Sequence, residues 1–385
     1  MFKVAIGHSE QIDSADAAAE IFEQCDEKLG GEKPCAGVLF AAISHEHRLI
    51  LDKILEKYPG IELIGCSSDG EMSTSGCFSE DSMILTLFVS DDVEIKAGCA
   101  RDIANDPHKA AFDAVNEARG KLSKPPALCI ALPESLTANL GVILEGVKKA
   151  LGREFPIFGG GSSEPGRFER TFQFFGREIL RDAIPLLLFS SPVIHSFAIS
   201  SGWKPIGQAK KITRSKANVV YEIGDEPAVK FYERYFGGDA TVIGGEFPMI
   251  VRDTEDSKSY IRAALRIDKK EGAVTYGGDI AEGSIVQLGE ASRDDLLVSA
   301  GDALEKALSC YPGKDPVMLF AFSCGARKAL LGTRTCEEFS FIREKVPKSC
   351  AIAGFYTYGE LSPIDGTKET KFHNATVVTL LLGVK

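Results

Sequence analysis

The stretch CAIAGFYTYGELSPIDGTKETKFHNATVVTLLL at residues 350–382 decides how the rest of the chain is interpreted. An apolar run ends in a turn that reads FYTYGE (355–360), a polar loop follows, and a second apolar run begins directly after HNAT (373–376). Apolar runs of this length between turn residues are typical of buried strands. Because polar and aromatic side chains lie between two such strands, this stretch predicts a functional site in addition to buried structural strands.

Two earlier parts of the chain repeat this arrangement. Three times the sequence predicts an apolar strand, a helix, a strand that runs into a Gly-rich turn, a loop and another apolar strand. The first turn, GCSSDGE (65–71), aligns without a gap with GFYTYGE (354–360), whereas the second, GGSSEPG (160–166), is one residue longer. Three matches in one structural context predict the duplication of a supersecondary unit.

The glycines of these turns have two possible reasons. A residue without Cβ allows a positive φ in a tight strand reversal, and it also allows a ligand to lie against the main chain. Successive exposed N–H groups in such a turn bind anions or carboxylates. Both interpretations stay open, and the second gains weight if the three turns converge at one end of the packed sheets.

The segments between the turns show helical periodicity with recognisable ends. Gly30-Gly31 is a stop signal and Asp106-Pro107 is a start signal. Helices are predicted at residues 14–29, 47–58, 106–122, 140–151, 225–236, 294–308 and 337–344.

These elements predict an α/β (α+β) fold with largely β-sheet cores, built from repeated strand-helix-strand-strand units. A length of 385 residues favours two domains, at residues 1–215 and 216–385. The polar and basic segment 202–238 is interpreted as a solvated connector between the two halves.

The composition excludes several classes of protein. Hydrophobic residues make up 44% and charged residues 26% of the chain, as in ordinary globular proteins. No apolar run approaches the roughly 20 residues that cross a bilayer, and no secretion signal is apparent, so we expect a cytoplasmic protein without membrane insertion. The net charge of −11, with both signs interspersed, argues against nucleic-acid binding.

Familiar catalytic and metal motifs are missing from the sequence. None of the ten cysteines forms a C-x-x-C pair, which argues against zinc ribbons and thioredoxin chemistry. The histidines of His45-Glu46-His47 are too close for a metalloprotease helix. No P-loop, Rossmann fingerprint or serine nucleophile elbow is visible.

Several motifs together resemble the FIST family, the F-box and intracellular signal transduction family. FYTYGELSP with HNAT resembles its C-terminal signature, and SGWKPIG (201–207) with ITRSKANVVYEI (212–223) resembles its central region. The turn CSSDGE and the segment FSCGAR (322–327) are also similar. The resemblance covers nearly the whole chain from about Cys35. It implies a FIST N-terminal and a FIST C-terminal domain that sense a ligand and do not catalyse a reaction.

The resemblance also implies the kind of ligand and partner. Family members are proposed to bind small molecules, amino acids among them, and to signal to a histidine kinase, a cyclase or a chemotaxis component. The two expected domains account for the residues of this sequence and neither is such a signalling module, so the resemblance implies a stand-alone sensor that acts through a partner protein. A subset of similar proteins is associated with haem, so a haem-binding nitric-oxide sensor is the alternative.

We expect the ligand-binding residues at the three turns and at polar strand ends. The candidates are Cys66, Ser67, Ser68, Gly160, Gly161, Ser162, Ser163, Cys324, Arg327, Tyr356, Tyr358, Glu360, His373 and Asn374. Arg327 suits a ligand carboxylate and Glu360 suits an ammonium, so together they would read a zwitterion. Tyr356 and Tyr358 share one side of an extended segment and suit stacking. Each candidate also has a structural interpretation, as an ion pair, a turn or core packing.

Two further hypotheses concern His373. It is a candidate axial ligand of haem, with His8 and His195 as alternatives. It is also a candidate partner of Cys66 or Cys324 in a thiol enzyme. No surrounding signature supports the thiol enzyme, so we expect neither catalytic nor metal-binding residues.

Overall fold

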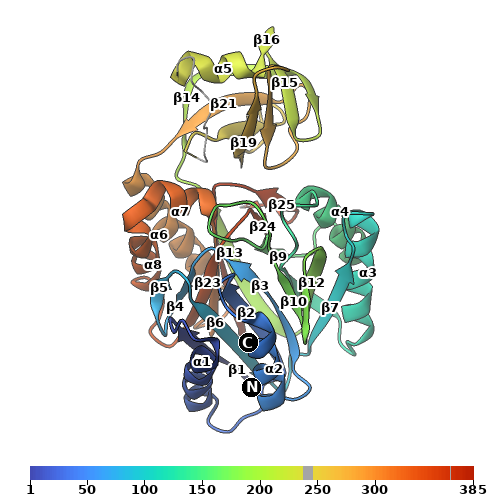
Figure 1. Ribbon diagram of the computed structural model, residues 1–385, viewed down its shortest axis with the longest axis vertical. Helices are drawn as coiled ribbons and strands as arrows, with labels where there is room; N and C mark the ends of the chain where they lie inside the picture. Colours follow the sequence, from blue (N-terminus) through green and yellow to red (C-terminus); the bar gives the residue numbers. More distant parts are fainter. Residues whose placement is uncertain (237–245, 365) are drawn as a thin grey trace.

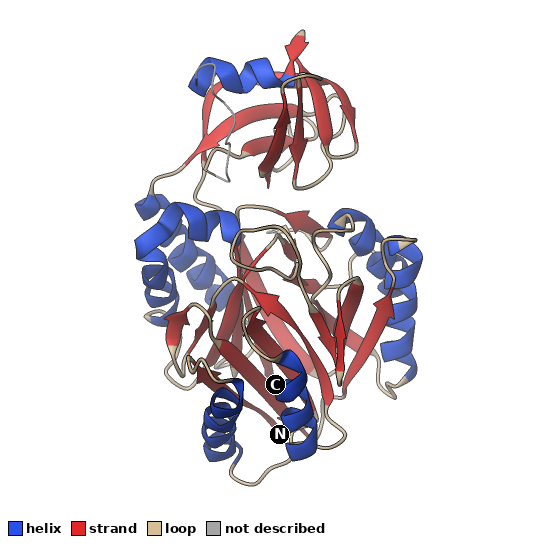
Figure 2. Ribbon diagram, in the orientation of Figure 1, coloured by secondary structure: helices blue, strands red, loops and turns tan. Residues whose placement is uncertain are grey.

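The computed structural model describes residues 1–236, 246–364 and 366–385. Three units of mixed α/β structure surround a common core, and a separate β module stands above them in the orientation of Figure 1. The helices of the three units lie on the outside and their strands on the inside (Figure 2). Both termini lie in the lower part of the three-unit body (Figure 1).

Two of the units, repeat 1 and repeat 2, follow one order of elements: strand, helix, strand, helix, strand, a hairpin of short strands and a long strand. Repeat 1 consists of β1 (Phe2–Ser9), α1 (Ser14–Leu29), β2 (Ala36–Ala42), α2 (His47–Lys57), β3 (Glu62–Ser68), β4 (Glu71–Ser73), β5 (Cys77–Ser79) and β6 (Met83–Ser90). Repeat 2 consists of β7 (Ile95–Arg101), α3 (Pro107–Gly120), β8 (Pro126–Ala131), α4 (Leu140–Leu151), β9 (Ile157–Gly160), β10 (Gln173–Phe175), β11 (Glu178–Leu180) and β12 (Ala183–Ser190).

Repeat 3 has a similar order but contains an insertion. Its first strand, β13 (Val193–Ser200), is separated from its first helix, α6 (Arg293–Ser309), by the module at residues 204–290. The rest of repeat 3 consists of β22 (Met318–Cys324), α7 (Gly325–Leu331), the 3-10 helix η1 (Gly332–Arg334), α8 (Thr335–Arg343), β23 (Ala351–Thr357), β24 (Glu360–Pro363), β25 (Thr370–His373) and β26 (Val377–Val384).

The three repeats exchange their short hairpins in a cyclic order. The β4-β5 hairpin of repeat 1 pairs with β23 of repeat 3, and the β10-β11 hairpin of repeat 2 pairs with β3 of repeat 1. The β24-β25 hairpin of repeat 3 pairs with β9 of repeat 2. Each of the three six-stranded sheets therefore contains four strands of one repeat and two strands of another. This arrangement confirms the predicted duplication and ties the three repeats into one body.

The core has an inner part and three outer parts. Aromatic side chains from all three sheets, such as Phe40, Phe189 and Phe320, meet in the inner part. In the outer parts α1 and α2, α3 and α4, and α6 and α8 each cover the sheet of their own repeat. Because both faces of each sheet are covered, the long strands are nearly continuous apolar runs.

The predicted helix ends agree closely with the structure. Helix α1 ends at Leu29, and Gly30 adopts the left-handed conformation with φ at 61°. Helix α3 begins at Pro107, and the side chain of Asp106 accepts a hydrogen bond from the main chain of Lys109. The prediction missed α7 and the short hairpins, because elements of three to seven residues carry little periodicity. Within the described ranges, no helix is long and apolar enough to cross a membrane.

A glycine at the equivalent place in each repeat has no room for a side chain. A Cβ on Gly65 or Gly354 would lie 2.2 Å from a carbonyl oxygen of the neighbouring parallel strand, and one on Gly159 would lie at 2.0 Å. Such separations are far below van der Waals contact, so close strand approach requires glycine at all three places. The structure therefore aligns Gly159, and not Gly160, with the first glycine of the other two turns, which corrects the alignment by one residue.

In its described residues, the β module inserted into repeat 3 is an eight-stranded sheet with one helix. Its elements are β14 (Lys204–Lys216), β15 (Val219–Ile223), β16 (Glu226–Pro227), α5 (Ala228–Phe236), β17 (Met249–Arg252), β18 (Tyr260–Arg262), β19 (Ala264–Asp268), β20 (Ala273–Tyr276) and β21 (Ile285–Glu290). The predicted connector within segment 202–238 is wrong: the side chains of β14 are mostly exposed, but its main chain pairs with β15 and β21. The predicted domain boundary between 215 and 216 lies inside β14; residues 237–238 lie outside the described residues.

Candidate functional site

The three Gly-rich turns meet, and we call residues 65–71, 159–164 and 354–360 the turn junction. Main-chain hydrogen bonds connect every pair of turns. They run from Ser163 N to Ser67 O (3.0 Å), Gly161 N to Gly359 O (2.9 Å), Tyr358 N to Gly161 O (3.1 Å) and Tyr356 N to Gly70 O (3.0 Å). The candidates of the first two turns, Cys66 to Ser68 and Gly160 to Ser163, are all buried here. The turns converge, but their main-chain groups bind one another.

A buried polar side chain begins each exchanged hairpin. Glu71, Gln173 and Glu360 are the first residues of β4, β10 and β24, and none of their side chains is exposed. Gln173 donates a hydrogen bond to Glu134, which is also buried, at 2.7 Å. Each repeat therefore places a buried carboxyl group at the start of its exchanged hairpin, although in repeat 2 this group belongs to Glu134, which follows β8.

Glu360 lies below the third turn among hydroxyl donors. Thr357 and Thr376 each donate a hydrogen bond to its carboxylate at 2.6 Å. Complete burial raises the pKa of Glu360 to about 7, and the two hydroxyls oppose this rise only in part. Because Glu360 is fully buried, the structure does not present it to a ligand ammonium.

Arg327 belongs to a buried network and not to an open site. Its side chain is 0% exposed, and its Nε donates to Glu338 at 2.9 Å. Its other donors go to Glu338, two main-chain oxygens and a hydroxyl. The hydroxyls of Tyr356 and Ser323 also donate to Glu338, at 2.6 and 2.8 Å. The hypothesis that Arg327 and Glu360 together read a zwitterion therefore finds no support in the geometry.

Tyr358 lies closer to the surface than Tyr356. Its hydroxyl donates to the main-chain oxygen of Glu164 at 2.6 Å, and its ring stacks on Phe168 with centroids 4.6 Å apart. Phe168 is 59% exposed. The two tyrosines thus contact different neighbours, and Tyr358 connects repeat 3 to the loop that follows the second turn.

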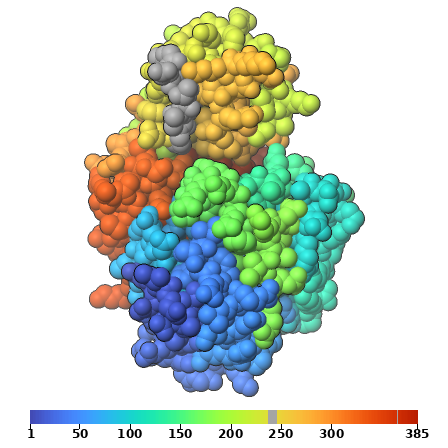
Figure 3. Space-filling view, viewed as in Figure 1, coloured from blue at the N-terminus to red at the C-terminus, as the bar shows by residue number. Residues whose placement is uncertain are grey.

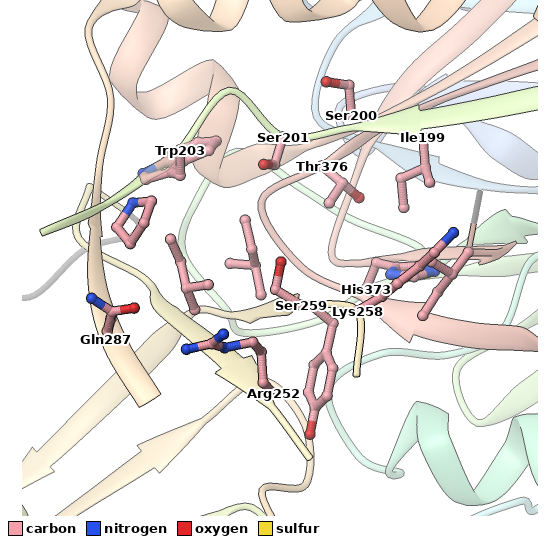
Figure 4. A pocket seen from close by; sticks show the side chains of 15 residues that line it. Ile199, Ser200, Ser201, Trp203, Arg252, Lys258, Ser259, Gln287, His373 and Thr376 are labelled. Atoms are coloured by element: carbon pink, nitrogen blue, oxygen red, sulfur yellow. The ribbon is translucent and has the colours of Figure 1, made fainter. Parts of the chain in front are cut away.

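A cavity of about 620 Å³ separates the β module from repeat 3. Figure 4 shows its two walls, with Ser201 and Thr376 on the side of repeat 3 and Arg252 and Ser259 on the side of the module. The space-filling view shows the module seated directly on the three-unit body (Figure 3). The volume is typical of sites for small molecules, and a position between two structural units is typical as well.

The cavity is cationic. Arg252 and Lys258 line it, and no aspartate or glutamate lines it among the described residues. The Arg252 guanidinium has no hydrogen-bond or ion-pair partner in the part of the chain that the structure describes. The hydroxyls of Ser200, Ser201 and Ser259 are also without hydrogen-bond partners there. A guanidinium and several hydroxyls around one space suit an anionic oxygen group.

His373 and Thr376 connect the cavity with the third turn. Both line the cavity, and the Thr376 hydroxyl also donates to Glu360. His373 pairs with Glu360 in the β24-β25 hairpin, and its Nε2 lies 2.9 Å from the main-chain oxygen of Ser362. Burial lowers the pKa of His373 to about 4, so its ring is neutral near pH 7. The structure places His373 at this cavity, away from the other two turns.

Asn374 holds the module against repeat 3. Its Oδ1 accepts a hydrogen bond from the main chain of Ala263 at 3.3 Å. Nearby, Arg262 of the module donates to the main-chain oxygen of Phe372 at 2.9 Å. Asn139 donates to Asp279 at 2.9 Å and ties the module to repeat 2. These contacts fix one side of the module next to the cavity.

Three histidines are candidate axial ligands of a haem, and the structure shows the surroundings of each. The Nε2 of His373 donates a hydrogen bond to the main-chain oxygen of Ser362, so this nitrogen carries a proton and has no free lone pair for a metal. Both ring nitrogens of His8 lie within 2.8 Å of serine hydroxyls. His195 packs against Phe158 and does not line the cavity. The haem hypothesis therefore gains no support from these three histidines.

The thiol hypothesis also lacks an accessible nucleophile. Cys66 and Cys324 are buried, and burial raises the pKa of both thiols well above the ordinary value. Neither sulfur lines the cavity in which His373 lies. A protonated and enclosed thiol is a poor nucleophile.

Sequence reasoning missed most residues of the cavity. Arg252 ends a four-residue strand, and no motif surrounds it. Trp203 and Thr376 could have been predicted as site residues, because they belong to SGWKPIG and HNAT, two of the motifs that carry the resemblance. The signal was present there, but a cavity wall built from two distant segments is visible only in the fold.

Comparisons with known proteins place these observations in a family. A cyanuric acid hydrolase from A. caulinodans matches 100% of this chain and 99% of its own, with 9% identity and a TM-score of 0.42. A chorismatase matches with 7% identity and a TM-score of 0.37 over 99% of this chain and 98% of its own. An uncharacterized protein of Mycobacterium tuberculosis strain H37Rv is 26% identical over 97% of this chain and 96% of its own. An uncharacterized protein of Mycobacterium bovis is 22% identical over 94% of this chain and 95% of its own. The FIST N domain model matches residues 35–226 and the FIST C domain model matches residues 228–363, so the chain belongs to the FIST family.

Proposed function

We propose that this FIST-family chain is a sensory protein that binds a small carboxylate in the cavity between the β module and repeat 3. The observation that carries the proposal is Arg252, a cavity-lining guanidinium without a partner among the described residues. A guanidinium presents a planar pair of donors that matches a carboxylate, and this geometry fixes both charge and orientation. The candidates of the three turns are less suitable, because most of them are buried and the turns are hydrogen-bonded to one another.

Binding would change how the module sits on repeat 3. A ligand held by Arg252 and Ser259 on one wall also reaches Ser201 and Thr376 on the other (Figure 4). The module joins repeat 3 at two points of the chain, and Gly202, with φ at 83°, lies at the first of them. A ligand that contacts both walls favours one relative position of the two parts, which is the physical basis of a sensor.

The proposed role is binding without catalysis. Among the residues that the structure describes, no thiol lines the cavity, and the ring of His373 is hydrogen-bonded to a main-chain oxygen. We propose that a signalling partner, such as a histidine kinase, a cyclase or a chemotaxis component, reads the ligand-bound form. The support for this partner is the family resemblance alone.

A thermal-shift screen of amino acids and small carboxylates tests the proposal, because a ligand that binds only the folded state raises the unfolding temperature. Each compound is tested on the wild type, on R252A and on R266A. Arg266 is an exposed arginine of the same module that does not line the cavity, so it is the matched control. We expect at least one carboxylate to stabilise the wild type and R266A but not R252A. Equal stabilisation of all three proteins would refute the site.

A further inference from the structure

The walls of the cavity favour ligands by other properties in addition to a negative charge. Resting on the proposed function, we infer that its ligand is an organic monocarboxylate with an apolar body and without an ammonium group. This class differs from the amino acids that the family resemblance implies, and the difference comes from the chemistry of the cavity walls.

The first argument is the absence of a partner for an ammonium. No carboxylate lines the cavity among the described residues. The nearby carboxylates already accept hydrogen bonds, Asp253 from Tyr260 at 2.8 Å and Asp279 from Asn139 at 2.9 Å. Glu360 is fully buried behind Thr376. A charged amino group beside Arg252 would find only neutral oxygens as acceptors in the described lining, and it would face a like charge.

The second argument is the apolar part of the walls. Ile199 and Trp203 come from the side of repeat 3, and Ile250 and Ile261 come from the module. The Trp203 Nε1 donates to the main-chain oxygen of Glu246 at 3.3 Å, so the indole offers mainly its ring surface to the cavity. Burial of an apolar ligand body against such walls is favourable in proportion to the apolar surface removed from water. A small polar anion would leave these walls without contact.

The third argument is the number of anionic groups. Arg252 is the guanidinium without a partner in the described lining, and one bidentate contact satisfies one carboxylate. Ser201 and Ser259 add neutral donors from opposite walls. A single carboxylate therefore matches the donors, and a volume of about 620 Å³ leaves space for the apolar body.

The experiment compares matched pairs that differ only in the amino group. They are 3-phenylpropionate and phenylalanine, 4-methylpentanoate and leucine, and indole-3-propionate and tryptophan. Each compound is titrated by calorimetry into the full chain and into R252A, R252K and R266A, with succinate and inorganic phosphate as further anions. Circular dichroism checks that every variant is folded.

We expect the member without the amino group to bind about tenfold tighter or more in the pairs that bind, a difference of about 1.4 kcal/mol, since an ammonium beside Arg252 has no carboxylate partner in the described lining. R252A should lose this binding, R252K should keep part of it and R266A should keep all of it. Equal or tighter binding of the amino acids overturns the inference. Binding of succinate alone through Arg252 also overturns it but leaves the proposed function standing, whereas binding of phosphate alone overturns both. If no anion binds, or if R252A binds as the wild type does, the proposed function fails as well.

Discussion

Thr376 donates a hydrogen bond to the Oε2 of Glu360 at 2.6 Å while it also lines the cavity between the β module and repeat 3. One hydroxyl therefore contacts both the proposed ligand site and the buried carboxylate below the third turn. Through Thr357 the same carboxylate reaches the turn junction, where the three repeats meet. A ligand that contacts Thr376 would therefore be connected to the turn junction through the hydrogen bonds of Glu360.

The first prediction concerns the titration of Glu360. Its pKa of about 7 in the fold exceeds the ordinary value of 4.5, so the folded state binds a proton that the unfolded state has released. This stabilising contribution is complete below pH 4.5 and is lost as the pH rises through 7. E360Q removes the titration. Between pH 5 and pH 8 we expect the free energy of unfolding of E360Q to gain on the order of 2 kcal/mol relative to the wild type, measured with urea.

Glu71 provides the matched control for this measurement. It is equally buried, accepts hydrogen bonds from Ser68 and Ser82, and has its pKa raised to about 7 by burial. E71Q should show the same change of stability with pH. Ser82 does not line the cavity, so only E360Q should alter the pH dependence of ligand affinity. If both variants leave the pH profile of unfolding unchanged, the assigned titrations are wrong.

The second prediction concerns the ion pair of Arg327 and Glu338, whose side chains are both 0% exposed. R327M leaves a buried carboxylate with two hydroxyl donors and no cation. We expect a loss of about 3 to 5 kcal/mol in the free energy of unfolding. R334A is the comparison, because it breaks a more exposed pair with Glu337 and should leave the urea midpoint nearly unchanged. If both substitutions change the free energy of unfolding by a similar, small amount, the ion pair of Arg327 and Glu338 does not stabilise the fold as we predict.

The third prediction concerns the close approach at Gly354. A Cβ there would lie 2.2 Å from the main-chain oxygen of Ala321, and neither strand can move without disturbing the sheet. We expect G354A to lower the free energy of unfolding by about 3 kcal/mol or more. G120A is the control, since no atom lies within 4 Å of its added Cβ at the end of α3. It should unfold at the same temperature as the wild type or slightly higher.

The fourth prediction concerns the thiols. Cys77, Cys310 and Cys336 are exposed, whereas Cys66 and Cys324 are buried with raised pKa values. Iodoacetamide at neutral pH should label the three exposed thiols first, as mass spectrometry of digested protein will show. Fast labelling of either buried thiol in the folded protein would revive the thiol enzyme.

Much of the fold could be predicted from the sequence because its signals are local. Helix periodicity, the cap at Asp106 and the stop at Gly30 depend on neighbouring residues, and the structure confirms them. The repeated turns also showed the duplication. The exchange of short hairpins between repeats was not predictable, because three-residue strands acquire their partners only in the tertiary structure. The strand β14 was missed because its exposed side chains resemble those of a linker.

The site was less predictable than the fold. Polarity at strand ends led to Arg327 and Glu360 as ligand-binding candidates, but it did not show whether the protein or a ligand satisfies these side chains. Only the structure shows that Glu338 holds Arg327. Arg252 carried no signal in the sequence, because the lack of a partner is a property of three-dimensional neighbours. His373 is the candidate that the fold brings to the cavity.

The most direct test of the proposed site is a calorimetric titration of the carboxylate that stabilises the wild type most, repeated with R252A and R266A. We predict that R252A binds about tenfold to hundredfold more weakly, as expected for the loss of one charge-assisted hydrogen-bond pair, and that R266A binds as the wild type does. Unchanged affinity in a folded R252A protein would contradict the account, because the carboxylate would then bind elsewhere.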